Sequence, residues 1–263
     1  MTHDAIGFGT WPFQGDDAER AVATAVEAGY RLIDTATKYG NEAAVGRGLR
    51  ASGVDLRELR IQTKLRGDDH GDVRGALGRS LEALGVDALD AWLIHWPLPM
   101  LGRYPEAWAE MVRLREEGLV REIGVSNFLP EHLERLIGET SVVPAVNQIE
   151  LHPHLQQHAA REYHAEQGIA TEAYSPLGSG KGILEIPAIV AIAQKHNRTP
   201  AQVVLRWHLQ LGNVVIPKSV TPARIAENID VFDFSLDAED LAAISALNED
   251  RRVGSDPAKF NAA

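Results

Sequence analysis

The amino-acid sequence predicts an α/β fold in which eight βα units close into a (β/α)8 barrel of the TIM type. Short apolar runs recur about every 30 residues, the length of one strand plus one helix. Five of these runs follow a helical pattern that ends in glycine. The runs are almost continuously apolar, as is typical of parallel strands buried on both faces. A polar or small cluster then ends each unit, as at the rim of such a barrel.

The strands and helices can be placed in order along the chain. Eight segments are predicted strands: 5–9, 31–34, 59–64, 89–95, 120–125, 144–148, 169–174 and 213–217. Amphipathic patterns between them predict helices, for example over 16–28, 71–84 and 104–117. Glycine stands before several strands because it adopts the left-handed conformation that ends a helix without steric cost.

The alternative architecture is an open, doubly wound sheet. That fold favours a G-x-G-x-x-G turn at the start of the first helix. The segment 7–12 (GFGTWP) lacks the third glycine and continues into proline. No shift in composition and no Pro/Ser-rich linker divides the chain, so residues 1–263 are expected to form a single barrel domain.

Composition excludes several classes of protein. The net charge of −11 and the lack of a basic stripe argue against a nucleic-acid partner. The absence of cysteine excludes disulfides, thiolate catalysis and zinc–thiolate sites. The N-terminus lacks the features of a secretory signal, and no apolar run approaches the roughly 18 residues of a membrane span. We expect a cytoplasmic protein without a membrane partner.

Four residues that follow predicted strands form a set with a clear chemical use: Asp34, Tyr39, Lys64 and His95. A free phenol has a pKa of about 10, which a nearby ammonium lowers. Lys64 would act on Tyr39 in this way, and Asp34 would keep the lysine charged. A neutral His95 would orient a carbonyl oxygen. Each residue alone suits a structural role, but the set on one rim favours a proton donor for carbonyl reduction.

A second signal follows the last strand. Lys218 and Ser219 end that strand, and Thr221 and Pro222 resemble the N-cap and first position of a helix. The free N–H groups and positive dipole end of this helix favour an anion. Arg224 in its first turn adds a fork of donors that suits phosphate. The plain alternative is an ordinary capped helix with surface charges.

Other rim residues acquire a meaning only if a nicotinamide lies at the barrel mouth. Tyr174 closes a strand and would present its face to a flat ring, and Asn127 and Gln148 carry amides that pair with a carboxamide. Each also suits a loop residue or a satisfied polar group at the rim.

Three histidines in HPHLQQH, His152, His154 and His158, invite a metal interpretation. His154 and His158 have the spacing that would place them on one helix face, but no carboxylate has ligand-like spacing. Solvent-exposed histidines are therefore favoured, and no metal site is expected.

Taken together, these motifs resemble the aldo-keto reductase family over nearly the whole chain. The matching segments, in the family's order, are GFGTW (7–11), DTATKYGNE (34–42), TKL (63–65), LIHWP (93–97), IGVSNF (123–128), NQIELHP (147–153), YSPLG (174–178) and IPKS (216–219). The TKLRGDDHG and ENIDVFDF segments are most similar to the bacterial branch that includes 2,5-diketo-D-gluconate reductases.

The resemblance implies an NADPH-dependent carbonyl reductase. Tyr39 would be the general acid, Lys64 and Asp34 its tuning pair, and His95 the orienting group. The implied NADP(H) site consists of Gly9, Thr10, Ser126, Asn127, Gln148, Tyr174, Ser175, Pro176, Leu177, Gly178, Ser179, Ile216, Lys218, Ser219, Arg224, Glu227 and Asn228. The substrate would contact Trp11, Tyr39, His95 and Trp96.

The chain also departs from the family pattern. Family members usually begin with a β-hairpin that covers the bottom of the barrel, whereas this chain starts almost at its first strand. The floor is then open, covered by other side chains, or covered by a neighbour. Short segments after Pro97 and Arg251 suggest an open site for small aldehydes, ketones or dicarbonyls.

Two further questions are left to expectation. We expect a monomer, with a dimer as the alternative. A non-catalytic NADP(H)-binding sensor or regulatory subunit on the same barrel is the rival function. The intact set of four rim residues favours the enzyme.

Overall fold

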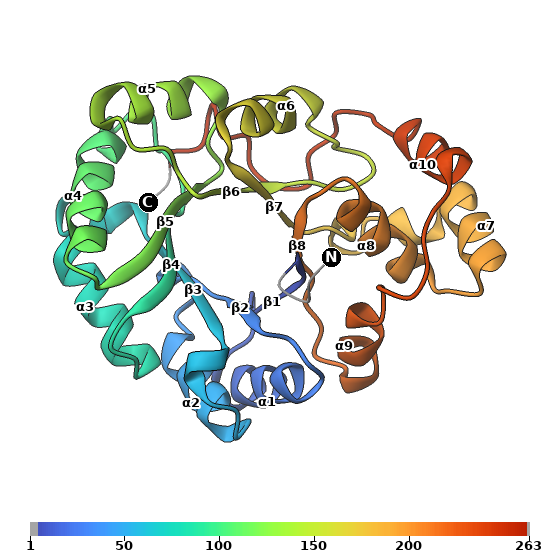
Figure 1. Cartoon of the computed structure of the whole chain (residues 1–263), viewed down its shortest axis with the longest axis horizontal. Coiled ribbons are helices and arrows are strands. Elements are labelled where there is room, and N and C mark those ends of the chain that lie inside the picture. Colours follow the sequence, from blue (N-terminus) through green and yellow to red (C-terminus); the bar gives the residue numbers. More distant parts are fainter. Residues whose placement is uncertain (1–4, 262–263) are drawn as a thin grey trace.

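The computed structural model describes residues 5–261, and its eight strands form one parallel sheet in sequence order, surrounded by helices (Figure 1). The strands are β1 (Gly7–Gly9), β2 (Leu32–Asp34), β3 (Arg60–Leu65), β4 (Leu89–Ile94), β5 (Val120–Ser126), β6 (Val146–Glu150), β7 (Ala170–Tyr174) and β8 (Val214–Ile216). All eight predicted strands are confirmed, to within two residues at each end.

The sheet closes on itself. Strands β1 to β8 pair with their neighbours in parallel. A bridge between Ile6 and Val215, and a 3.0 Å hydrogen bond from the N–H of Gly9 to the carbonyl of Pro217, join β1 to β8. The (β/α)8 barrel is therefore confirmed, and the open sheet is excluded.

The helices cover the outside of the barrel (Figure 1). They are α1 (Gly15–Glu27), α2 (Glu42–Ala51), α3 (Val73–Leu84), α4 (Tyr104–Glu116), α5 (Pro130–Thr140), α6 (His158–Gln167), α7 (Pro187–His196), α8 (Pro200–Gln210), α9 (Pro222–Ile229) and α10 (Ala238–Ser245). Helices α7 and α10 lie beside each other outside the ring, where Lys195 and His196 pair with Asp240. No helix within residues 5–261 is long and apolar enough to cross a membrane.

The glycines that end the repeated units have the conformation that their place requires. Their φ angles are 106° at Gly29, 71° at Gly85, 81° at Gly118, 72° at Gly168 and 80° at Gly212. All five lie in the region that other residues rarely adopt. These five chain reversals between helix and strand are thus encoded locally in the sequence.

Side chains from the strands themselves cover the floor of the barrel. Arg60 begins β3, and its guanidinium pairs with Glu122 of β5 at 2.6 Å. Leu32 and Val146 are buried beside this pair, at the first positions of their strands. The floor was expected to be open, covered by other side chains, or covered by a neighbour. Side chains of the strands cover at least this part of it. The family's N-terminal hairpin was expected to be missing before the first strand. That part of the chain is largely residues 1–4, which lie outside the described residues.

Candidate active site

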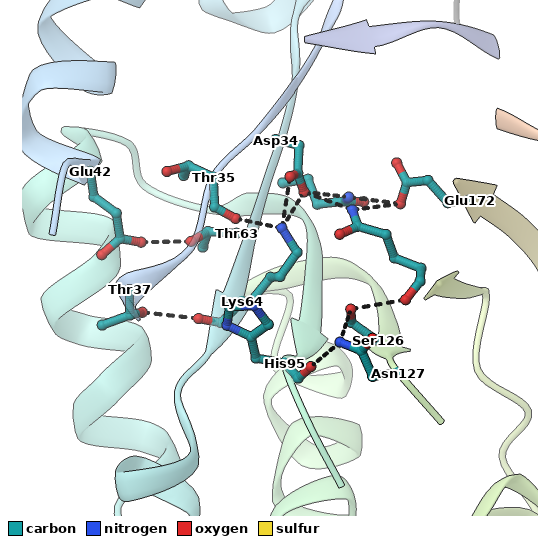
Figure 2. Close-up of polar contacts among 12 residues, drawn as sticks. Asp34, Thr35, Thr37, Glu42, Thr63, Lys64, His95, Ser126, Asn127 and Glu172 are labelled. Atoms are coloured by element: carbon teal, nitrogen blue, oxygen red, sulfur yellow. Dashed lines mark hydrogen bonds and ion pairs between the residues drawn. The ribbon is translucent and has the colours of Figure 1, made fainter. Parts of the chain in front are cut away.

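A buried ion pair lies at the centre of the barrel mouth (Figure 2). The Nζ atom of Lys64 lies 2.6 and 2.7 Å from the two carboxylate oxygens of Asp34 and donates to the carbonyl of Thr35 at 3.0 Å. The side chain of Lys64 is completely buried. Burial acts to lower the pKa of Lys64, but the charges of Asp34 and Tyr39 raise the pKa above its ordinary value. The ammonium is therefore charged at neutral pH.

Tyr39 lies above this ion pair, in a short turn (Thr37–Tyr39) that follows β2. The centre of its ring is 5.3 Å from the Nζ atom of Lys64. Burial raises the pKa of Tyr39 above its ordinary value, and the attraction of Lys64 offsets this only in part because Asp34 and Glu172 also raise it. Lys64 lowers the pKa of Tyr39 as expected, but burial raises that pKa by more. The phenol is consequently protonated at neutral pH, the form that a proton donor needs.

His95 completes the set. It follows β4, and its ring centre lies 5.7 Å from that of Tyr39, edge to face. Burial, and then the positive charges of Lys64 and Lys38, lower the pKa of His95 well below its ordinary value. The imidazole is therefore neutral at neutral pH, with one N–H to donate. The structure thus brings all four of these rim residues together.

A layer of polar side chains lies beneath the mouth, where barrel interiors usually hold Val, Ile or Leu. The amide nitrogen of Gln62 donates to Asp34 at 2.9 Å and to Glu172 at 2.8 Å. The amide nitrogen of Gln148 donates to the same two carboxylates, at 3.0 and 3.2 Å. Sequence reasoning missed Gln62 and Glu172. Their spacing could have revealed them. Gln62 stands two residues before Lys64, and Glu172 two residues before Tyr174, so each shares a strand face with a predicted site residue.

The rim around β5 to β7 contains a connected set of polar side chains, among them the residues expected to contact a nicotinamide. The hydroxyl of Tyr174 donates to the amide oxygen of Asn127 at 2.9 Å. The Asn127 amide nitrogen donates to the carbonyl of His95 and to the Ser126 hydroxyl (Figure 2), and this hydroxyl donates to the carbonyl of Gln148. Since the Gln148 amide nitrogen points at buried carboxylates, its amide oxygen remains to accept a bond from a carboxamide.

The phosphate segment lies on the surface. Helix α9 begins at Pro222 with Thr221 as N-cap, as predicted, and the Thr221 side chain does not cap the free N–H groups. Lys218 and Arg224 are exposed, and neither forms an ion pair within the described part of the chain. The hydroxyl of Ser219 accepts from the N–H of Thr221 at 3.1 Å. This arrangement of donors fits a phosphate group.

Two more residues of the expected cofactor site, Glu227 and Asn228, lie in the same helix. The carboxylate of Glu227 accepts a bond from the Thr199 hydroxyl at 2.8 Å. Asn228 is buried beneath the helix. Glu227 therefore has one oxygen engaged within the protein, which limits how it can contact a nucleotide.

The remaining residues of the expected cofactor site flank this segment. At the end of β1, a Cβ on Gly9 would lie 3.0 Å from Ile216, and the buried hydroxyl of Thr10 has no hydrogen-bond partner. The loop after β7 contains Ser175, Pro176, Leu177, Gly178 and Ser179. Within it, a Cβ on Gly178 would lie 2.2 Å from Ile183. These residues thus include one buried hydroxyl without a hydrogen-bond partner and two glycines against which neighbouring side chains pack closely.

A cavity of about 40 Å³ lies beside His95. Its lining is Lys38, Arg66, Gly67, His95, Trp96, Leu98 and Phe260. The rings of Trp96 and Phe260 lie 4.2 Å apart, whereas Trp11 is 55% exposed and lies 5.1 Å from Tyr39. Lys38, Arg66 and Phe260 were not expected from the sequence. A larger cavity of about 450 Å³ lies between α6 and α8, away from these groups, and contains no rim residue.

The C-terminal tail lies along one side of the mouth, at the ends of β4 and β6. Glu150 accepts bonds from the backbone N–H groups of Val253 and Gly254, and the Asn261 side chain accepts from the N–H of Met100 at 3.0 Å. The pocket is therefore narrower than its short loops suggested, because the tail lies along one side of it.

Of the three clustered histidines, His158 is exposed as expected, whereas His152 is not. His152 is completely buried and lies 3.0 Å from a carboxylate oxygen of Glu150, so it is not a solvent-exposed residue. Helix α6 begins at His158, and His154 lies in the preceding loop, so the two do not share a helix face. Within residues 5–261, no three His, Asp or Glu side chains are grouped as metal ligands.

Comparison with known proteins gives one consistent result. A family model described as the aldo/keto reductase family matches residues 5–249. An aldo-keto reductase of Mycolicibacterium smegmatis is 52% identical, and the match covers 97% of this chain and 94% of that protein. Methylglyoxal reductase DkgA of Escherichia coli is 49% identical, with 97% and 93% covered. A crystal structure of a Gox0644 variant in complex with NADPH has a TM-score of 0.93 at 49% identity, covering 97% of this chain and 94% of that one. The chain belongs to the aldo/keto reductase family.

Proposed function

We propose that this protein reduces small aldehydes, ketones or dicarbonyls to alcohols with NADPH, and that Tyr39 is the general acid. The observation that carries the proposal is the buried Lys64–Asp34 pair directly beneath a protonated phenol. A neutral imidazole lies beside that phenol. One relative is named a methylglyoxal reductase, which supports the reaction. The structure of another is a complex with NADPH, which supports the cofactor.

Each residue has a separate task in this reaction. The reduced nicotinamide, when bound, supplies a hydride to the carbonyl carbon. Tyr39 donates its proton to the carbonyl oxygen, and the N–H of His95 bonds to that oxygen and orients it. Lys64 stabilises the phenolate that remains, which then regains a proton from water. Asp34 holds the ammonium in place at 2.6 Å.

The choice of NADPH over NADH rests on the segment after β8. Lys218, Ser219 and Arg224 stand beside the uncapped first turn of α9. A 2′-phosphate carries close to two negative charges at neutral pH, and these donors complement it. NADH lacks that group and would leave these donors without a partner.

The pocket beside His95 favours a small substrate. Its volume of about 40 Å³ leaves little room between Trp96 and Phe260. Methylglyoxal, the substrate in the name of the E. coli relative, is a small dicarbonyl.

The test is NADPH consumption with methylglyoxal and a panel of aldehydes and ketones. The Tyr39→Phe variant should lose about 10²–10⁴-fold in kcat, the usual contribution of general acid catalysis, while its NADPH dissociation constant stays unchanged. Tyr163→Phe, in a partly buried residue of α6, is the matched control and should keep full turnover. Retained turnover in Tyr39→Phe would remove Tyr39 from the acid role. NADPH binding without turnover on any carbonyl would refute the enzyme proposal.

A further inference from the structure

Glu172 is a carboxyl group inside the barrel that none of the proposed catalytic steps uses. It lies in β7, two residues before Tyr174, and its neighbours in the sheet are Gln148 and Val214. It is 1% exposed. Figure 2 shows Glu172 to the right of Asp34, with the Lys64 ammonium below Asp34. A charge at this depth requires a physical reason, because burial penalises ionised groups strongly.

The hydrogen bonds link Glu172 to the catalytic ion pair. Gln62 and Gln148 each use one amide nitrogen to reach both Asp34 and Glu172. An amide NH₂ has two hydrogens, so each glutamine gives one to each carboxylate. Lys64 bonds directly only to Asp34. The carboxylates of Asp34 and Glu172 are therefore joined by two neutral amide groups, and one cation, Lys64, bonds to Asp34.

The second oxygen of Glu172 differs from the first. Its Oε2 atom accepts both amide bonds, whereas its buried Oε1 atom has no partner among the described residues. A carboxylate oxygen without a donor is costly in a buried site, and adding a proton there lowers the cost. Burial and the charge of Asp34 raise the pKa of Glu172 to about 7.

We propose that Glu172 is a positioning residue that tunes the acidity of Tyr39 through the bridging amides of Gln62 and Gln148 and the Asp34–Lys64 pair. This rests on the proposed function, in which Tyr39 is the acid. The titratable groups that face Glu172 are Asp34, Lys64 and Tyr39. Strands β1 and β8, which close the barrel beyond β7, contain no titratable residue.

The direction of the effect follows from the charges. At the pH where Tyr39 titrates, Glu172 is ionised, and its negative charge opposes formation of the phenolate. Removing that charge must therefore lower the pKa of Tyr39. Reduction needs the protonated phenol, so the alkaline decline of kcat should move to lower pH.

Glu172→Gln isolates this charge. The side chain has nearly the same shape, and its carbonyl oxygen can accept the two amide bonds that Oε2 accepts now. Its NH₂ group would occupy the position of the partnerless Oε1 atom. Glu172→Asp keeps the charge and should keep the native pH profile. Glu122→Gln is the matched control, because Glu122 is also in the barrel but is paired with Arg60 at the floor.

The experiment measures kcat against pH for the four proteins. In Glu172→Gln the alkaline decline should move to lower pH by less than about 1 pH unit, because burial, Lys64 and Asp34 all act more strongly on Tyr39 than Glu172 does. Glu122→Gln and Glu172→Asp should not move it. An unmoved decline in a folded, active Glu172→Gln protein would overturn the proposal and leave the proposed function intact.

A second measurement does not depend on turnover. The phenolate absorbance of Tyr39 can be followed as the difference between each protein and its Tyr39→Phe counterpart. The midpoint should fall in Glu172→Gln. An equal midpoint in both backgrounds would refute the tuning role even if no carbonyl substrate were found, whereas absent turnover in the wild type would refute the proposed function alone.

Discussion

The barrel mouth and the segment after β8 both contain cations, but they hold them in opposite ways. Lys64 is completely buried, and its ammonium has three hydrogen-bond contacts to Asp34 and Thr35. Lys218 and Arg224 are exposed and form no ion pair within residues 5–261. The Nζ atom of Lys218 lies over the ring of Phe13, 5.7 Å from the ring centre.

The difference separates two kinds of electrostatic work. A buried cation must be compensated before any ligand arrives, so its loss is expected to affect folding as well as chemistry. A hydrated surface cation adds little to stability and acts when a phosphate binds. The first region is therefore pre-organised for a reaction, and the second is available for recognition. Four changes would break or sharpen this contrast.

The largest effect is expected at Lys64. Lys64→Met leaves Asp34 buried without its cation, which should cost about 3–5 kcal/mol of unfolding free energy, in addition to turnover. Urea denaturation measures the loss. The double variant Lys64→Met/Asp34→Asn should regain much of the stability and none of the activity. A single variant as stable as the wild type would contradict the view that this pair is needed for folding.

Arg224→Ala is expected to act on cofactor binding instead. NADPH should bind more weakly by about 1.5–3 kcal/mol, the range for hydrogen bonds to charged groups, and NADH should be almost unaffected. Unfolding free energy should change by less than about 0.5 kcal/mol, as for other surface substitutions. Arg57→Ala, at an exposed arginine paired with Asp55, is the control. Equal losses for both cofactors would sink the 2′-phosphate assignment.

Phe260→Ala tests the substrate side of the mouth. Loss of the ring contact with Trp96 should raise KM for the carbonyl by an amount equivalent to about 0.5–1.5 kcal/mol. The NADPH dissociation constant should not change, because Phe260 lies over the substrate cavity. Steady-state kinetics at saturating NADPH give the value. An unchanged KM would show that the tail does not contact the substrate.

The smallest effect concerns acid pH. The pKa of His95 is lowered well below its ordinary value, so the imidazole stays neutral as pH falls from 7 to about 5.5, and Tyr39 stays protonated. In that range kcat should not fall. NADPH affinity should weaken slightly, because the phosphate gains a proton near about pH 6. A decline of kcat with a midpoint near that of free histidine would mean that His95 titrates normally.

Most of the fold could be predicted because its signals are local. Apolar runs and terminal glycines such as Gly85 and Gly168 mark each unit wherever it lies in the barrel. The rim residues followed from the rule that parallel strands end on the same side. The helix of Pro222 was predicted from its N-cap pattern alone.

What could not be predicted depends on distance and burial. The raised pKa of Tyr39 results from desolvation, which the sequence does not report. Glu172 stands in an apolar strand like a surface residue, but it accepts hydrogen bonds from Gln148 on the neighbouring strand and from Gln62 across the barrel. The stacking of Phe260 on Trp96 joins segments far apart in the chain. His152 was expected to be exposed to solvent but is buried against Glu150.

The tail along one side of the mouth has an evolutionary consequence. The match to the family model ends at residue 249, and the tail that Glu150 and Met100 hold begins just after it. The proton-transfer groups all lie within the matched part, whereas Phe260 lies beyond it. If Phe260 contacts the substrate as proposed, exchange of residues after 249 can change selectivity without any change to the barrel. A lineage with this architecture can acquire new carbonyl substrates while its inherited catalytic machinery stays under separate selection.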